Sequence, residues 1–335
     1  MNRLISSAIS AAFLSGLVSM SWADRPDGEP TCSFTGGAFY SSTNTLYLES
    51  FSAVGAAVSV TSEQSQCVKD ATKNKTPFNV IVERNTALTN NSTLVLPVKG
   101  YQLAGTSKNC MGFLEPSQMS YNTSTQTWRL EVNSKTNAVD NNFGVIVSVD
   151  TSKTGCKALK EIELTASSLE ILSASDYSRD VYDSKNHTAD YWDLVGAYVY
   201  KSWDENPNDE GTIYGYAAKK KGTVSAGQFV KIGGGAYIPP LRLYLRLSSS
   251  APQAIRSNVP MVLKKEAAAE TFKIPETIDV VIVDKKDNTT NLKRLNSGVR
   301  ELRTVDSWYD LKGRKLKGKP ANKGMFVGKT KFQKQ

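Results

Sequence analysis

The sequence contains few residues of the types that catalyse reactions. His187 is the single histidine among 335 residues, which excludes a metal site built on two histidines and leaves at most one histidine-based triad. No G-x-S-x-G motif, which would present a serine nucleophile on a sharp turn, occurs in the chain. We therefore interpret His187 as an exposed loop residue, and we expect no enzymatic activity and no cofactor.

Acidic residues are densest in the segment Asp204–Glu210. Its oxygen-bearing side chains alternate along the chain, as hard ligands for Ca²⁺ could. The segment departs from an EF-hand loop, because Pro207 interrupts it and Gly215 occupies the twelfth position. A polar hairpin loop without a metal is the better interpretation. A glycoside hydrolase, which needs two carboxylates across a cleft, is the most distant alternative for the whole chain.

Tyrosine and tryptophan residues gather between residues 177 and 244. Their amphipathic rings could stack on sugars or on a partner protein. Cross-strand packing in a β core explains the same enrichment, and we expect it for most of these rings. Trp192 and Trp203 are flanked by polar residues, so we predict that they form an exposed platform. With the neighbouring Tyr191 they are the candidate ligand-binding residues.

Four cysteines are present, at positions 32, 67, 110 and 156, and no CxxC motif occurs. An even number of cysteines in an exported chain favours disulfide bonds over a metal site. Three pairings are possible. We favour the sequential one, Cys32 with Cys67 and Cys110 with Cys156, because neighbouring strands usually pair locally.

The first 23 residues have the pattern of a secretory signal peptide. Arg3 provides the positive charge, residues 4–18 are apolar or small, and Ser21 and Ala23 are small residues at the positions that a signal peptidase reads. The apolar run is shorter than a transmembrane span needs. We therefore expect a secreted or cell-surface protein that begins near Asp24 after cleavage.

Between the signal peptide and the C-terminus the sequence predicts an all-β protein. Short alternating or apolar runs rich in valine, threonine and tyrosine recur between glycine, asparagine and serine turns. We predict two antiparallel β-sandwich-like modules, a linker with a hairpin, and a short C-terminal β-hairpin module. Their expected bounds are 24–168, 169–247, 248–305 and 306–335.

Two segments carry more local expectations. Residues 241–247 alternate strictly, which predicts a strand that buries its leucines and exposes Arg242, Tyr244 and Arg246. Residues 264–270 favour a helix, although the segment is too short to be stable alone.

Positive charge is concentrated at the C-terminus. Residues 285–335 contain 15 Lys and Arg against 4 Asp and Glu, whereas the whole chain has a formal net charge of +9. The rest of the chain is therefore close to neutral, which argues against a nucleic-acid-binding domain. Within the basic segment, Trp308, Tyr309 and Phe326 are spaced by glycines in a way that favours a small folded unit over a solvated extension.

The segments 308–316, 318–320 and 323–327 resemble a C-terminal sorting domain with the pattern W-Y-D-L-x-G-R-x-L…G-K-P…K-G. Such tails are similar to type IX secretion signals and occur on surface proteins of fibre-degrading anaerobic Gram-negative bacteria. Segments 82–97 and 215–245 resemble a β module found beside such tails. The residues that carry the tail resemblance are Trp308, Tyr309, Asp310, Gly313, Arg314, Gly318, Lys323 and Gly324.

The resemblance implies that outer-membrane secretion and sorting machinery is a partner. Polysaccharide or cell-surface components are the expected ligands, because a β scaffold with long polar loops and exposed aromatic rings suits binding. We expect an exported, non-enzymatic β protein with a binding or adhesion role. The alternative is a carbohydrate-binding module that assists polysaccharide degradation.

Overall fold

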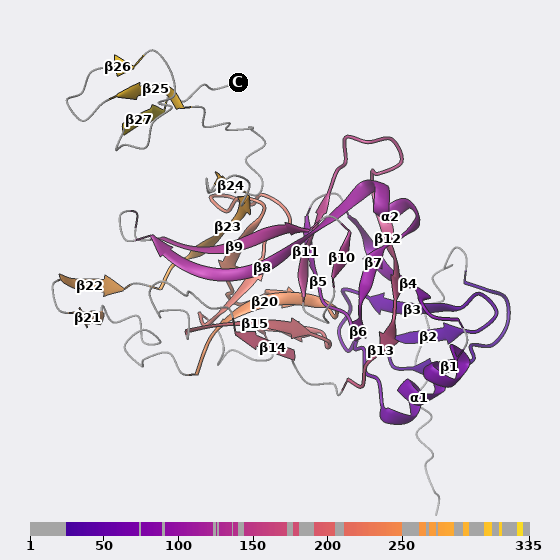
Figure 1. The fold of residues 1–335 in the computed structure, drawn as a ribbon. Helices are drawn as coiled ribbons and strands as arrows, with labels where there is room; N and C mark the ends of the chain where they lie inside the picture. The colour runs from indigo at the N-terminus through magenta and orange to yellow at the C-terminus, as the bar shows by residue number, and fades with distance from the viewer. Residues whose placement is uncertain are drawn as a thin grey trace, which may run out of the picture.

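The computed structural model describes residues 25–249, apart from 74, 89–90, 123–124, 126, 136, 140–143, 173–176, 181–190 and 205–210, and beyond them 261–265, 268–272, 274–284, 291–294, 305–309, 315–316 and 327–330. This part of the chain consists mainly of strands and contains two short helices (Figure 1), so the all-β prediction is confirmed. The predicted signal peptide, 1–23, lies outside the described residues.

The smaller of the two main sheets has seven strands. All its pairs are antiparallel except the parallel pair of the third and fourth strands. Its strand order is β1 (Cys32–Phe34), β2 (Gly37–Tyr40), β3 (Thr45–Ser50), β4 (Phe78–Leu88), β12 (Leu159–Ala166), β7 (Tyr101–Leu103) and β10 (Ala138–Val139).

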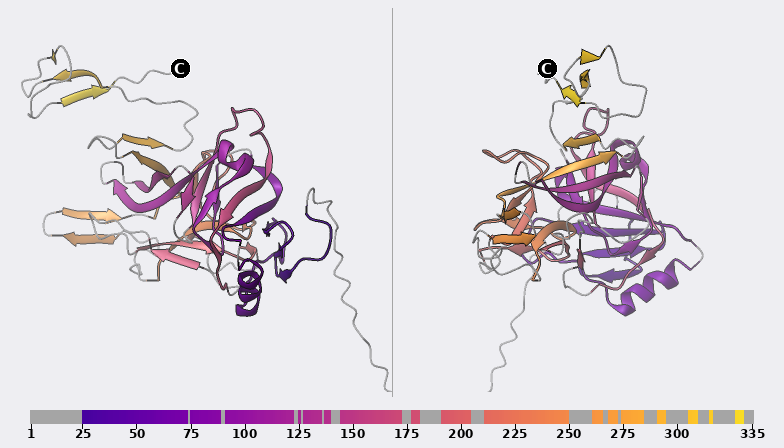
Figure 2. Two further views of the ribbon diagram at one scale, coloured as in Figure 1. Left: turned by 45° about the vertical axis from the view of Figure 1, so that its right-hand side comes forward. Right: turned by 60° about the vertical axis from the view of Figure 1, so that its left-hand side comes forward.

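The larger main sheet has eleven strands and combines early and late segments of the chain. Its order is β14 (Tyr177–Asp180), β15 (Trp192–Ala197), β20 (Arg242–Leu247), β17 (Ile213–Tyr216), β18 (Gln228–Lys231), β23 (Thr277–Asp284), β9 (Thr127–Lys135), β8 (Met111–Asn122), β11 (Val145–Val149) and β5 (Ser92–Leu94), with β24 (Asn291–Arg294) paired to β23. The pairing of β23 with β9 is parallel, and it joins residues 279–283 to residues 129–133. Figure 2 shows the two main sheets from two sides.

Smaller β units complete the described structure. They are β6 (Val98–Lys99) with β13 (Ser168–Leu169), β16 (Lys201–Ser202) with β19 (Tyr237–Ile238), β21 (Met261–Lys265) with β22 (Ala268–Phe272), and β25 (Val305–Tyr309) between β26 (Lys315–Leu316) and β27 (Val327–Thr330). Residues 264–265 and 268–270 of the helix-favouring segment therefore lie in paired strands, because cross-strand backbone hydrogen bonds outweigh the helix propensity of so short a segment.

The large sheet crosses the boundary that the sequence pattern predicts at residue 168. Strands β5, β8, β9 and β11 precede that boundary, and β14, β15, β17, β18, β20, β23 and β24 follow it within the same sheet. The segment expected to be a linker contributes β23, which lies between β18 and β9. Short local patterns reveal strands but not their partners, and the partners here are more than a hundred residues apart.

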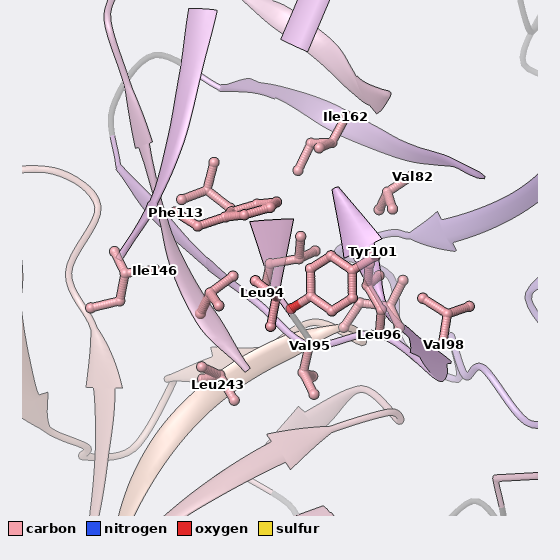
Figure 3. Packing of buried hydrophobic residues seen from close by; sticks show 14 of the residues in the cluster. Val82, Leu94, Val95, Leu96, Val98, Tyr101, Phe113, Ile146, Ile162 and Leu243 are labelled. Atoms are coloured by element: carbon pink, nitrogen blue, oxygen red, sulfur yellow. The ribbon is translucent and has the colours of Figure 1, made fainter. Parts of the chain in front are cut away.

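One hydrophobic core extends across both main sheets. Val82 and Ile162 of the smaller sheet face Leu94, Phe113 and Leu243 of the larger sheet, and all five are buried (Figure 3). Tyr101 lies among them, with its ring edge-on to Phe113 at a centroid separation of 5.6 Å. Burying this much apolar surface between two sheets is the main source of stability in such a fold.

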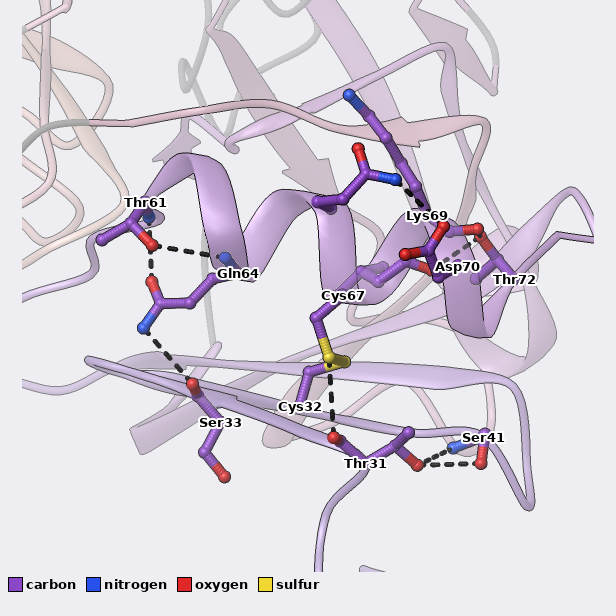
Figure 4. Close-up of a disulfide and its surroundings, with 12 residues drawn as sticks. Thr31, Cys32, Ser33, Ser41, Thr61, Gln64, Cys67, Lys69, Asp70 and Thr72 are labelled. Carbon is purple, nitrogen blue, oxygen red and sulfur yellow. Dashed lines mark hydrogen bonds between the residues drawn. A yellow bond between two sulfur atoms is a disulfide. The ribbon is translucent and has the colours of Figure 1, made fainter.

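The two disulfide bonds follow the sequential pairing, which confirms the prediction. Cys32 of β1 is bonded to Cys67 of helix α1 (Ser62–Ala71), and Cys110, at the end of helix α2 (Gly105–Cys110), is bonded to Cys156. Figure 4 shows the first bond tying the helix to the edge of the smaller sheet. Disulfides of this kind persist in oxidising compartments.

Strand β20 departs from its predicted pattern. Its leucines are buried as expected, but Arg242 and Tyr244 are buried as well. A second, smaller cluster around Trp203, Val195 and Tyr244 covers that face of the sheet. Alternation along the strand therefore shows that its side chains point to two faces of the sheet. It does not show that one of these faces is in contact with water.

Candidate functional site

The predicted platform residue Trp192 lies in the core, which makes the prediction of its exposure wrong. It is 0% exposed, and its ring packs edge-on against Trp128 and Tyr214, with ring centroids 5.7 Å and 5.1 Å away. Its polar neighbour Asp193 points to the opposite face of β15 and pairs with Arg246 at 3.1 Å. A salt bridge thus lets a polar residue flank a buried ring.

Trp203 is also buried, at 2% exposure, and the same prediction is wrong for it. It packs with Ile232, Ile238 and Tyr244 in the second hydrophobic cluster, beneath the β16–β19 pair. Tyr191 is half-buried and packs against the main core. The three predicted residues therefore do not form an exposed platform together.

The structure places a different aromatic pair at the surface directly beside Trp203. The rings of Tyr200 and Tyr237 are stacked, with centroids 5.6 Å apart and planes inclined by 20°. Tyr237 is 53% exposed, which is exceptional for a large hydrophobic side chain in the described part of the chain. We refer to Tyr200 and Tyr237 as the tyrosine pair.

Short backbone contacts hold the tyrosine pair in position. Ser202 and Tyr237 are partners in the β16–β19 ladder, and the Tyr200 amide donates to the Ala56 carbonyl oxygen at 2.7 Å. The Asp204 carboxylate accepts a hydrogen bond of 2.8 Å from the Gly235 amide, which closes the turn before Tyr237. The buried Trp203 supports this unit from below. Contacts within the protein thus position both rings.

Stacked, partly exposed aromatic rings can bind the apolar face of a sugar ring or an aromatic or guanidinium group of a partner. The sequence contains a signal for this pair. The glycine run 233–235 predicts a turn, and the alternation after it places Tyr237 and Ile238 on opposite faces. Polar flanking residues, on which the prediction for Trp192 and Trp203 rested, carry less information than this alternation.

The other sequence candidates add no second site. Asp204 takes part in the turn described above, while 205–210 and His187 lie outside the described residues. Within the described ranges, no group of three metal-ligating side chains occurs. Of the tail residues, Trp308 and Tyr309 lie in β25, and Asp310, Gly313, Arg314, Gly318, Lys323 and Gly324 lie outside the described residues.

The outer face of the smaller sheet carries an ion-pair cluster near the predicted start of the mature chain. Arg25 binds both oxygens of the buried Glu83 carboxylate and lies 2.9 Å from a Glu49 oxygen. Its guanidinium also lies over the Tyr47 ring, 5.4 Å from the centroid. Burial opposes the charge of Arg25, but the hydrogen bonds and charges of the two glutamates outweigh it and raise the pKa of Arg25.

Arg84 has a very different environment. It is 8% exposed, and its Nη1 atom has no hydrogen-bond partner. Among the described residues its guanidinium pairs with no carboxylate, and its hydrogen bond is a long one of 3.4 Å from Nε to the Thr86 carbonyl oxygen. Burial lowers the pKa of Arg84 to about 10. This buried cation therefore costs stability.

No family model, curated protein or solved structure matches this chain. The helices in the described ranges are too short and too polar to cross a bilayer.

Proposed function

We propose that this chain is an exported, non-enzymatic β protein of the cell surface or the medium, with a binding or adhesion role. The observation that carries the export proposal is the pair of disulfide bonds, Cys32–Cys67 and Cys110–Cys156. Such bonds form outside the reducing cytosol, which agrees with the secretory signal pattern of residues 1–23. The tail, 306–335, is proposed to deliver the protein through outer-membrane sorting machinery.

Cell fractionation tests the delivery step. The full chain and a variant that lacks residues 306–335 would be expressed in a bacterium with a type IX secretion system. The full chain is expected in the outer-membrane and medium fractions, and the truncated chain in the periplasm. Equal distribution of the two proteins would contradict the role of the tail and leave the binding proposal to its own test.

The tyrosine pair favours carbohydrate binding as the second candidate function. An exposed ring surface offers a sugar the apolar contact it needs. The test is affinity electrophoresis of the mature chain through gels that contain xylan, mannan, β-glucan or pectin. Retardation in at least one gel is expected.

Two variants at one position and one control sharpen this test. Tyr237→Ala should abolish the retardation, whereas Tyr237→Phe should retain most of it because the ring surface stays. Ile171→Ala removes a different exposed apolar side chain, 63% exposed, and should leave retardation unchanged. Carbohydrate binding at this pair would be refuted by unretarded wild type in every gel, or by equal retardation of Tyr237→Ala.

A further inference from the structure

A half-open pocket of about 300 Å³ lies between the C-terminal half of α1 and the strands β4 and β13. It is remote in sequence from the tyrosine pair and is formed by different elements. Its volume is at the lower end of the range of small-molecule sites, which is about 300–1,000 Å³. We refer to it as the α1 pocket.

The floor of the α1 pocket is apolar. Val68 from the helix, Phe78 from β4 and Leu169 from β13 line it, and all three side chains are almost fully buried. A ligand with a compact aliphatic part would gain about 25 cal/mol for each Å² of apolar surface that it buries there.

The rim of the α1 pocket is basic. Lys69, in the last turn of α1, and Lys73, two residues past its end, line it, and no Asp or Glu does. Figure 4 shows the Lys69 side chain leaving the helix on the side away from the Cys67 disulfide. Neither ammonium pairs with a carboxylate within the described ranges, and the nearby Asp70 accepts instead from Gln66 at 2.9 Å. Two like charges at the same rim repel each other, so an anion close to both is favoured.

Two hydroxyl groups at the α1 pocket are available as donors. Thr76 and Ser168 line it and have no hydrogen-bond partner among the described residues. In contrast, the Thr72 and Ser167 hydroxyls already donate to the carbonyl oxygens of Val68 and Lys99, each at 2.8 Å. Thr76 and Ser168 can therefore donate to an anionic oxygen that lies near the lysines.

Contacts within the protein fix the helix that forms one wall of the α1 pocket. Thr61 and Gln64 form a reciprocal capping box at its start, with bonds of 2.8 Å and 3.2 Å. The Ser65 hydroxyl donates to the Leu169 carbonyl oxygen at 3.1 Å, and Cys67 is bonded to Cys32. A preformed wall lowers the entropic cost of binding.

We propose that the α1 pocket binds a small aliphatic carboxylate, with its carboxylate group between Lys69 and Lys73 and its alkyl chain against Val68, Phe78 and Leu169. The apolar floor and the basic rim select this chemistry together, because a cation meets repulsion at the rim and a fully polar anion leaves the floor unfilled.

The experiment uses the mature full-length chain, with octanoate as the probe and octylammonium and octan-1-ol as matched compounds of the same chain length. In ¹H–¹⁵N correlation spectra, octanoate is expected to shift the amides of Val68, Lys69, Lys73 and Leu169. Octylammonium should leave them in place, and octan-1-ol should bind more weakly than octanoate. Added salt should weaken octanoate binding because the lysines are exposed.

Charge reversal tests the role of the lysines. The double variant Lys69→Glu/Lys73→Glu should weaken octanoate binding by roughly tenfold or more, since each charge contact contributes about 1 kcal/mol in water. Lys219→Glu/Lys220→Glu, which changes the same charge at exposed lysines elsewhere, should bind as the wild type does. Thr76→Val should weaken octanoate and leave octan-1-ol unaffected.

Three results would overturn the proposal. The first is the absence of amide shifts at about 10 mM octanoate, because the Kd would then lie far above this concentration and the pocket would not be a specific site. The second is equal binding of octanoate and octylammonium, which would make the pocket merely apolar. The third is equal weakening by the two double-lysine variants, which would indicate an effect of overall charge.

Discussion

Arg84 offers a sharp test of the energetics of this fold. It lies two residues after Val82 on β4, so both side chains leave the strand on the core face, where Val82 is fully buried. Burial disfavours the charged guanidinium and lowers the pKa of Arg84 to about 10. We therefore predict that the substitution Arg84→Met stabilises the protein.

The magnitude follows from the pKa shift. Each pKa unit corresponds to about 1.4 kcal/mol, so the buried charge costs about 3 kcal/mol. The long hydrogen bond to the Thr86 carbonyl oxygen offsets about 1 kcal/mol of this at most. Met fills a similar volume without charge, and the free energy of unfolding should rise by about 2 kcal/mol.

The pH dependence has a definite sign. The folded-state pKa is below the unfolded one, so the cost is complete below about pH 10 and declines as the pH rises further. The advantage of Arg84→Met over the wild type should therefore be largest near neutral pH and shrink in strongly alkaline buffer.

Urea unfolding at neutral pH, with the midpoint and slope fitted separately, measures the effect. Arg242→Met is the matched control, because Arg242 is also 8% exposed but its Nη1 donates to the Ser92 hydroxyl and to the Thr93 carbonyl oxygen at 2.8 Å. That control should lose about 1–3 kcal/mol. Destabilisation by Arg84→Met would refute the reasoning, since it would mean that the guanidinium makes favourable interactions in the folded protein.

The remaining predictions also concern stability. Arg25→Met should destabilise the protein by about 1–3 kcal/mol in urea unfolding, because the buried Glu83 carboxylate loses its cation; an unchanged midpoint would contradict this. Removal of either disulfide, by Cys32→Ser/Cys67→Ser or by Cys110→Ser/Cys156→Ser, should lower the free energy of unfolding by about 4 kcal/mol, because the bonds join residues 35 and 46 positions apart. Thermal unfolding of the oxidised wild type beside each variant tests this. An unshifted Tm would count against it. Trp203→Ala should cost about 3–5 kcal/mol, in contrast to Tyr237→Ala at the surface, and calorimetry that finds equal losses would oppose the assignment of Trp203 to the core.

At the candidate site, the sequence alone did not predict correctly which aromatic side chains are exposed. Polar neighbours suggested that Trp192 and Trp203 are exposed, yet Asp193 pairs with Arg246 and the Asp204 carboxylate closes a turn. Partners distant in the chain satisfy these polar groups, so they do not mark contact with water. The exposure of Tyr237 depends likewise on which strands cover the second face of β15 and β20.

The sequence by itself predicted the strand content, favoured the sequential pairing of the four cysteines and carried the pattern of an export signal. Each of these depends on local composition or on spacing along the chain. Only the tertiary structure decided that β9 and β23 join in one sheet, and that Trp192 is buried and Tyr237 exposed. It also decided that Arg25 has carboxylate partners, whereas Arg84 has none among the described residues. Those outcomes depend on contacts between residues far apart in the chain. The periodicity of apolar residues and the secondary-structure propensities do not encode such contacts.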